Sequence, residues 1–335
     1  MIKIVIFSFC LLFSGIAFGQ EKLDGVIYSA QDSSAVFGAS IYFDGTSLGV
    51  SSNKDGSFLL KKPSEITAPL VISSLGFEKL IIPALQLNSS AIPPVYLKPS
   101  EEMLTTVKIE ADPWTREKKM KIFKKEFLGS SPEAEKCRIK NAKAIELSYR
   151  PSAQTLTASS EEPIIVKNRY LGYEIKYELR NFQVNFTTGS SGIQLIHSVY
   201  YDGTSFFKEL KEKTTNKTLR NRDKIYKGSV LHFMRSLASK KLEENQFDIY
   251  HDRFKVAAYQ FFKLTRLESL TLVELLTHKV VILYNHAKQS TLQSNGKFVI
   301  DDLGNHSPPQ NLIFGGYMAA GRISHLLPLN FNLKN

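Results

Sequence analysis

Short apolar runs, each ended by Gly, Pro, Asn or Asp, fill the chain from Leu23 to about Leu97. Apolar and polar residues alternate within these runs, and no segment with a helical period interrupts them. Alternation with a period of two is typical of half-buried strands, and closely spaced turn residues are typical of an antiparallel sandwich. The sequence therefore predicts an all-β sandwich over residues 20–98.

An acidic and amide cluster, Asn53-Lys54-Asp55-Gly56, lies inside this region and could form either a calcium loop or a turn. A calcium loop of the EF-hand type needs acidic or amide ligands at its first, third and fifth positions and a glutamate at its twelfth. Only Asn53 and Asp55 are available here, whereas the pair Asp55-Gly56 suits a tight turn with positive φ. The sequence predicts a turn.

The segment DGVIYSAQDSSAVFGASIYFDGTSLGVSSNKDGSFLL, followed by LVISSLGFEKLIIP, resembles the carboxypeptidase regulatory-like domain. The residues that carry the resemblance are Gly25, Gly38, Ala39, Ile41, Gly49, Asp55, Gly56, Phe58, Ser74, Gly76 and Phe77. The resemblance implies a transthyretin-like, Greek-key, antiparallel β-sandwich. It also implies an accessory module of envelope proteins, especially those of Bacteroidota, that is not itself a peptidase.

The first residues have the pattern of a secretory signal peptide. Lys3 precedes an apolar run that ends near Phe13, and the small residues Ala17 and Gly19 follow. A membrane anchor needs about 20 apolar residues, so this run is too short. We therefore expect a signal peptide over residues 1–19, no transmembrane segment in the mature chain, and a location in the periplasm, at the outer membrane or outside the cell.

The formal net charge of the chain is +11. In a cytoplasmic protein this charge would suggest nucleic acid as a partner, whereas for an exported protein we expect anionic lipid or glycan surfaces and no nucleic acid. The expected partners are an envelope protein or an anionic glycan or lipid surface. A charge that only keeps the protein soluble is the alternative.

A linker or late strand is expected over residues 99–112, and a helix follows it in DPWTREKKMKIFKKEFLG. Asp112 is a suitable N-cap and Gly129 a suitable C-terminal residue, while Phe123 and Phe127 belong to an apolar stripe. Five lysines are expected to project to solvent, either as an ordinary solvated face or as a binding patch for an anionic surface: Lys118, Lys119, Lys121, Lys124 and Lys125.

Residues 113–335 are predicted to form an α+β domain. The run Tyr173–Arg180 alternates without error, and the phase then slips by one residue, so that Phe182 continues the apolar face. This slip predicts a bulge near Arg180. The pair Asp202-Gly203 is expected to be a hairpin turn.

A second helix is predicted after Ser229, which is a suitable N-cap. Helix N-terminal amides and nearby cations together could bind a phosphate or a carboxylate. The candidate residues for this anion site are Arg222, Lys224, Ser229, His232 and Arg235. In the alternative interpretation Ser229 only caps the helix and the cations are solvated.

No catalytic or metal-binding motif is present. No histidine begins an H-E-x-x-H or H-x-x-E motif, so the chain is not a zinc carboxypeptidase. Gly45–Gly49 matches G-x-S-x-G in letters, but it joins two predicted strands, whereas a nucleophile elbow joins a strand to a helix.

We expect no cofactor, no metal and no catalytic residue, and predict an exported, non-catalytic binding or assembly module of the bacterial cell envelope. The alternative is a hydrolase that acts on envelope glycan or peptide through the C-terminal domain.

Overall fold

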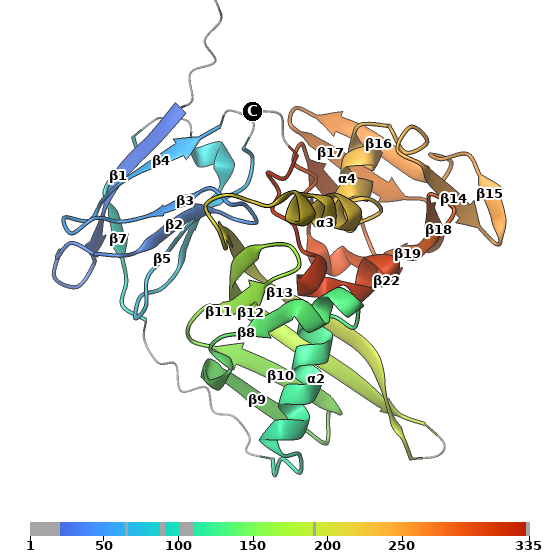
Figure 1. Cartoon of the computed structure of the whole chain (residues 1–335), viewed down its shortest axis with the longest axis horizontal. Helices are drawn as coiled ribbons and strands as arrows, with labels where there is room; N and C mark the ends of the chain where they lie inside the picture. The colour runs from blue at the N-terminus through green and yellow to red at the C-terminus, as the bar shows by residue number, and fades with distance from the viewer. Residues whose placement is uncertain (1–20, 64–65, 88–90, 101–109, 190–191, 333–335) are drawn as a thin grey trace, which may run out of the picture.

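The computed structural model describes residues 21–63, 66–87, 91–100, 110–189 and 192–332. The predicted signal peptide, residues 1–19, and residues 101–109 of the predicted linker lie outside this part of the chain. Three hydrophobic clusters divide the described residues among an N-terminal, a middle and a C-terminal unit (Figure 1).

The N-terminal unit is a sandwich of two small sheets, with strand orders β4-β1-β7 and β3-β2-β5-β6. Its strands are β1 (Glu21–Ser29), β2 (Ser40–Phe43), β3 (Gly49–Ser51), β4 (Ser57–Lys62), β5 (Leu70–Ser73), β6 (Leu80–Ile82) and β7 (Val95–Leu97). The predicted all-β sandwich is confirmed. One pair differs from the antiparallel expectation, because β7 runs parallel to β1 with Ile27 opposite Val95.

The cluster at Asn53 is a turn, as predicted. The N–H of Gly56 donates to the carbonyl of Asn53 at 3.0 Å, and Gly56 has a φ of 78°. The carboxylate of Asp55 accepts hydrogen bonds from the N–H and hydroxyl of Ser57. The turn joins β3 to β4, which belong to different sheets of the sandwich.

The middle unit packs helix α2 (Arg116–Leu128) against a curved antiparallel sheet. Its strands are β8 (Cys137–Ile139), β9 (Ile145–Arg150), β10 (Thr155–Ser160), β11 (Ile164–Asn168), β12 (Tyr173–Thr188) and β13 (Gln194–Glu209), with short 3-10 turns η2 (Pro132–Lys136) and η3 (Ala142–Ala144). Phe123 and Phe127 of α2 are fully buried and contact Phe182 of β12. The predicted apolar stripe of this helix therefore forms the middle core.

The bulge predicted near Arg180 is confirmed, because the pairing of β12 with β13 shifts register between Leu179 and Asn181. The predicted turn at Asp202-Gly203 is wrong. Both residues lie inside β13, where Gly203 pairs with Leu179 and Asp202 with Asn181. The pair lies opposite the bulge, and a bulge tolerates the same small and polar residues as a turn.

The C-terminal unit consists of helix α4 (Val230–Ala238) and two antiparallel sheets, ordered β15-β14-β18-β19-β22 and β16-β17-β20-β21. Helix α3 (Asn216–Tyr226) precedes it and buries Ile225 in the middle core. The strands are β14 (Phe247–His251), β15 (Phe254–Val256), β16 (Phe262–Leu267), β17 (Leu270–Leu275), β18 (Lys279–Tyr284), β19 (Lys288–Ser294), β20 (Phe298–Asp301), β21 (His306–Ser307) and β22 (Leu312–Gly316). Helix α5 (Tyr317–Ala320) and the 3-10 turn η5 (Arg322–His325) follow. Residues 113–335, predicted as one α+β domain, thus pack around two separate cores.

The sandwich is attached to the middle unit through the loop between β2 and β3. The N–H of Gly45 donates to the carbonyl of Ser205, and the N–H of Phe207 donates to the carbonyl of Thr46. The carboxylate of Asp44 accepts a hydrogen bond from the N–H of Ser205 at 2.8 Å. The G-x-S-x-G match therefore lies in a structural contact between strands, as its sequence context indicates.

A buried carboxylate strengthens this contact. The hydroxyl of Tyr42 donates to Glu178 at 3.0 Å, and Lys79 forms an ion pair with the same carboxylate at 2.7 Å. The alternation of the sequence places Glu178 on a solvated face, but docking of the sandwich leaves this residue only 9% exposed.

The C-terminal segment connects all three units. Arg235 of α4 donates hydrogen bonds to the carbonyls of Leu303, Leu329 and Phe331. Leu303 belongs to the sandwich core, whereas Ile323 belongs to the middle core. The three cores are therefore joined by hydrogen-bonded and packed contacts.

Candidate functional site

Helix α2 begins later than the sequence predicts. Its N-cap is Thr115, whose hydroxyl accepts a hydrogen bond from the N–H of Lys118 at 3.3 Å. The carboxylate of Asp112 accepts instead from the N–H of Tyr149 in β9, at 3.0 Å. The prediction of Asp112 as N-cap is wrong because this carboxylate joins the chain before the helix to the sheet. Gly129 ends the helix as predicted.

Four lysines of α2 are exposed, whereas one of its two acidic residues is buried. Glu126 is buried and forms an ion pair with Arg322 at 2.9 Å. Four of the five predicted lysines are exposed, and none of the four forms an ion pair within the described part of the chain: Lys118, Lys121, Lys124 and Lys125. We call these four residues the α2 lysine face.

Lys119 does not belong to this face, although the sequence placed it in solvent. Its side chain is 11% exposed and forms an ion pair with Asp112. Burial opposes ionisation of Asp112, but the hydrogen bonds from Lys119 and from the N–H of Tyr149 outweigh it and hold the pKa of Asp112 below its usual value. Lys119 thus has a structural contact and is not free to bind a partner.

Arg222 of the predicted anion site is also occupied. Its guanidinium forms two hydrogen bonds with the Glu209 carboxylate, at 2.9 and 2.6 Å, and a third with the carbonyl of Leu171. It also lies 3.7 Å from the centre of the Tyr173 ring. This buried arginine fixes α3 to the turn between β11 and β12.

The other residues of the predicted anion site do not converge around Ser229. Ser229 caps α4 as predicted, and its hydroxyl accepts from the N–H of His232. The ring of His232 faces inward and accepts from the N–H of Gly228; burial, helped by nearby cations, lowers its pKa to about 4. Arg235 holds the C-terminal segment, and Lys224 lies 3.8 Å from Glu133. The expected anion site is therefore not formed by these side chains.

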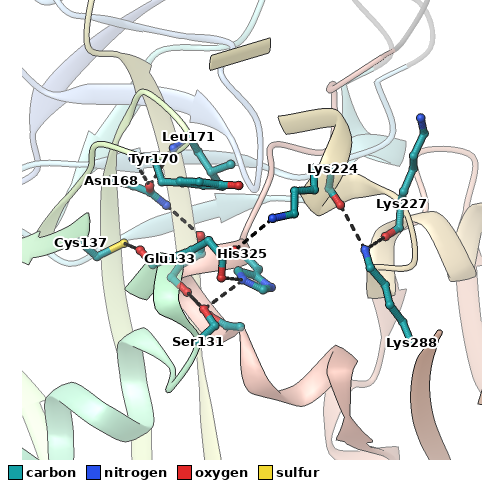
Figure 2. A network of polar contacts seen from close by, with 12 residues as sticks. Ser131, Glu133, Cys137, Asn168, Tyr170, Leu171, Lys224, Lys227, Lys288 and His325 are labelled. Carbon is teal, nitrogen blue, oxygen red and sulfur yellow. Dashed lines mark hydrogen bonds and ion pairs between the residues drawn. The ribbon is translucent and has the colours of Figure 1, made fainter. Parts of the chain in front are cut away.

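A serine, a carboxylate and a histidine that no sequence motif indicated meet between η2 and η5 (Figure 2). The Nε2 atom of His325 lies 3.1 Å from the hydroxyl of Ser131 and 3.2 Å from the carboxylate of Glu133. Asn168 donates a hydrogen bond to the carbonyl of Ser324 in the same region. Because nearly two hundred positions separate η2 from η5, only the fold brings these groups together.

The geometry of this cluster differs from that of a nucleophilic triad. In a triad one ring nitrogen accepts the serine proton while the other donates to the acid. Here Ser131 and Glu133 both contact the same nitrogen of His325, so the ring does not link them through its two nitrogens. Burial lowers the pKa of His325, and the Glu133 carboxylate opposes this shift. The cluster fastens the C-terminal segment to the end of α2.

Aromatic side chains gather where α2 begins. The rings of Trp114 and Tyr149 stack with centres 3.7 Å apart, and Phe186 of β12 packs edge-on against Trp114 at 5.3 Å. The ammonium of Lys118 lies 3.7 Å from the centre of the Trp114 ring. This aromatic group therefore connects the α2 lysine face to the hairpin formed by β12 and β13.

The N-terminal unit is a β-sandwich module. The model of the CarboxypepD_reg-like domain family matches residues 23–109. The chain therefore carries a CarboxypepD_reg-like domain in its N-terminal quarter, as the resemblance implied. No curated protein matches the chain.

In the described residues, no three or more His, Cys, Asp or Glu side chains lie close enough together to hold a metal ion. Over the same residues, every helix is too short or too polar to cross a membrane.

Proposed function

We propose that the protein is an exported, non-catalytic binding module of the bacterial cell envelope, and that the α2 lysine face contacts an anionic partner. The observation that supports this proposal is the cluster of four exposed lysines on α2. Its buried Glu126 is neutralised from inside by Arg322, whereas the exposed lysines lack acidic neighbours within ion-pair distance in the described structure. Clustered charges of one sign attract and orient partners of the opposite sign.

Two further observations agree with this proposal. The net charge of +11 favours association with anionic surfaces in general. The N-terminal module belongs to a class that usually accompanies other domains and does no chemistry. Export is proposed from the sequence pattern of residues 1–19 alone.

The alternative function, a hydrolase, would need a serine or an acid activated by a separate base. Ser131, Glu133 and His325 supply the residue types for such a site. Their shared contact on Nε2 does not supply the relay of a triad, because the nitrogen that bonds the acid is also the one that would accept the serine proton. The geometry therefore supports binding better than hydrolysis.

Replacing Lys118, Lys121, Lys124 and Lys125 by glutamine is expected to weaken binding to an anionic polymer by at least about tenfold, since each lysine near an anionic surface contributes about 1 kcal/mol. Retention on immobilised heparin and co-sedimentation with vesicles that contain phosphatidylglycerol measure this effect. Binding of the unmodified protein should also fall with added salt, because salt screens exposed charges.

The matched control replaces four exposed lysines elsewhere by glutamine: Lys54, Lys61, Lys263 and Lys279. Both variants lower the formal net charge from +11 to +7, so they differ only in the place of the lost charge. The proposal requires a much larger loss for the α2 variant. Equal losses in the two variants would show that total charge, and not the α2 lysine face, determines binding.

A further inference from the structure

The hairpin of β12 and β13 exposes aliphatic side chains near its tip. Ile193 is 61% exposed, Leu195 is 56% exposed and Ile196 is 41% exposed. The distal part of this hairpin extends beyond the rest of the middle unit (Figure 1). Exposed apolar side chains that cluster in this way mark a surface that is covered by a partner.

The same hairpin carries no charge over a long stretch. Residues 181–201 contain no Asp, Glu, Lys or Arg, although such residues make up 22% of the chain. Soluble proteins usually protect an exposed edge strand with charged side chains or proline. The absence of both here suits a segment that leaves water, because a charge is costly in a lipid environment.

The uncharged tip lies next to the α2 lysine face. Gln194 donates a hydrogen bond to the hydroxyl of Tyr149 at 2.7 Å, and Tyr149 stacks on Trp114, over which Lys118 lies. One end of the middle unit therefore combines aliphatic side chains, an aromatic group with polar edges, and Lys118 of the α2 lysine face. Tryptophan and tyrosine prefer the membrane interface, and lysines attract anionic lipid headgroups.

We propose that this end of the protein docks on an anionic lipid bilayer. Ile193, Leu195 and Ile196 enter the headgroup region and the upper acyl region, while Trp114 and Lys118 remain at the surface. This inference rests on the proposed function and names its partner as lipid. Insertion is shallow, because the outer backbone edge of β13 still needs water or headgroups to satisfy its hydrogen bonds.

Charge complementarity favours a bilayer over a second copy of the chain. Pairing of two hairpins would bring two bodies of the same strongly positive charge together and place Lys118 of each near the other. An anionic bilayer attracts those lysines and accepts the apolar tip at the same time. The arrangement thus matches a surface that is apolar inside and negative at its boundary.

The test replaces Ile193, Leu195 and Ile196 by serine in the full mature chain. Binding to vesicles of phosphatidylcholine with phosphatidylglycerol is expected to weaken by about tenfold or more, because apolar contact with the acyl region is lost. Retention on heparin should stay unchanged, because the lysines remain. The matched control replaces three aliphatic residues of similar exposure in the C-terminal unit by serine: Leu267, Leu276 and Ile313.

Trp114 provides a direct readout, since it is the only tryptophan in the chain. Brominated lipids in anionic vesicles are expected to quench its fluorescence in the unmodified protein and in the control variant. The variant with Ile193, Leu195 and Ile196 replaced by serine is called the hairpin variant. At a vesicle concentration at which it and the unmodified protein are both bound, the hairpin variant should show clearly less quenching. A far-ultraviolet spectrum and melting temperature close to those of the unmodified protein establish that the variants are folded.

Two results would overturn the inference. If the hairpin variant binds vesicles as tightly as the unmodified protein, with equal quenching, the tip does not contact lipid, even where the α2 lysines do. If the unmodified protein is a dimer without vesicles and the hairpin variant is a monomer, the tip is an interface between two copies. A failure of the α2 lysine variant alone to lose binding would instead contradict the proposed function.

Discussion

Replacing Gly203 by asparagine is expected to lower the free energy of unfolding by about 3 kcal/mol, which is at the upper end of the usual cost of overpacking. A Cβ atom at this position would lie 2.2 Å from the carbonyl oxygen of Glu178 and 2.8 Å from the ring of Tyr177. Neither neighbour can move easily, because the first is backbone opposite the bulge and the second is part of the core. The midpoint of urea unfolding measures the loss.

The control for this prediction replaces Gly76 by asparagine. Gly76 has a φ of 81°, which asparagine tolerates better than most residues, and no atom lies within 4 Å of its added Cβ. We expect a loss of at most about 1 kcal/mol there. Equally small losses at both positions would mean that Gly203 lies in an open turn, as the sequence alone predicts, and not inside β13.

Replacing Asp44 by asparagine is expected to stabilise the protein by about 2 kcal/mol at neutral pH and to have little effect near pH 4. Burial raises the pKa of Asp44 to about 6, and the hydrogen bond from the N–H of Ser205 and the charges of Lys79 and Arg180 offset only part of this shift. Asparagine retains an oxygen that can accept from Ser205 and carries no charge.

The direction of this pH dependence follows from the protonation of Asp44 in the folded protein and in the unfolded chain. Between pH 3.8 and about 6 the unfolded chain releases the Asp44 proton while the folded protein keeps it, so the stability contributed by this residue falls as pH rises through that window. Above pH 6 the cost of the buried charge is complete. Urea unfolding of both forms at pH 4 and pH 7.5 measures the difference, with the exposed Asp55→Asn variant as control. A gain of the same size at both pH values would contradict burial as its cause.

Features that depend on neighbours in sequence were predictable. The alternation after Tyr173, the slip near Arg180 and the cap at Ser229 all agree with the structure. Each depends on side-chain direction or on a hydrogen bond within a few residues, and a sequence pattern reports such relations directly. The sandwich was predictable for the same reason, since its strands are short and their turns are local.

Features that depend on distant contacts were not predictable. The alternation of the sequence places Glu178 on the solvated face of its strand. The docked sandwich buries this residue and supplies Tyr42 and Lys79 as its partners. Asp112 has the properties of an N-cap, but β9 supplies a donor that its carboxylate prefers to the helix. In both cases a partner far away in the chain outweighed a local preference.

The proposed binding surface, which consists of the α2 lysine face and the tip of the hairpin of β12 and β13, depends on both local and distant features. The lysines of α2 were visible in the sequence, but the burial of Glu126 against Arg322, nearly two hundred positions away, comes only from the fold. The uncharged stretch at residues 181–201 was also present in the sequence. Its exposure and its contact with Trp114 through Phe186 come only from the folded hairpin.

The sequence by itself determined the strand and helix pattern, the N-terminal sandwich and the excess of positive charge, because periodicity, turn residues and composition are local properties. Only the tertiary structure decided which charged groups are paired inside the protein and which apolar side chains stay exposed. Those outcomes depend on the packing of segments far apart in the chain, where burial and pairing of charges compete.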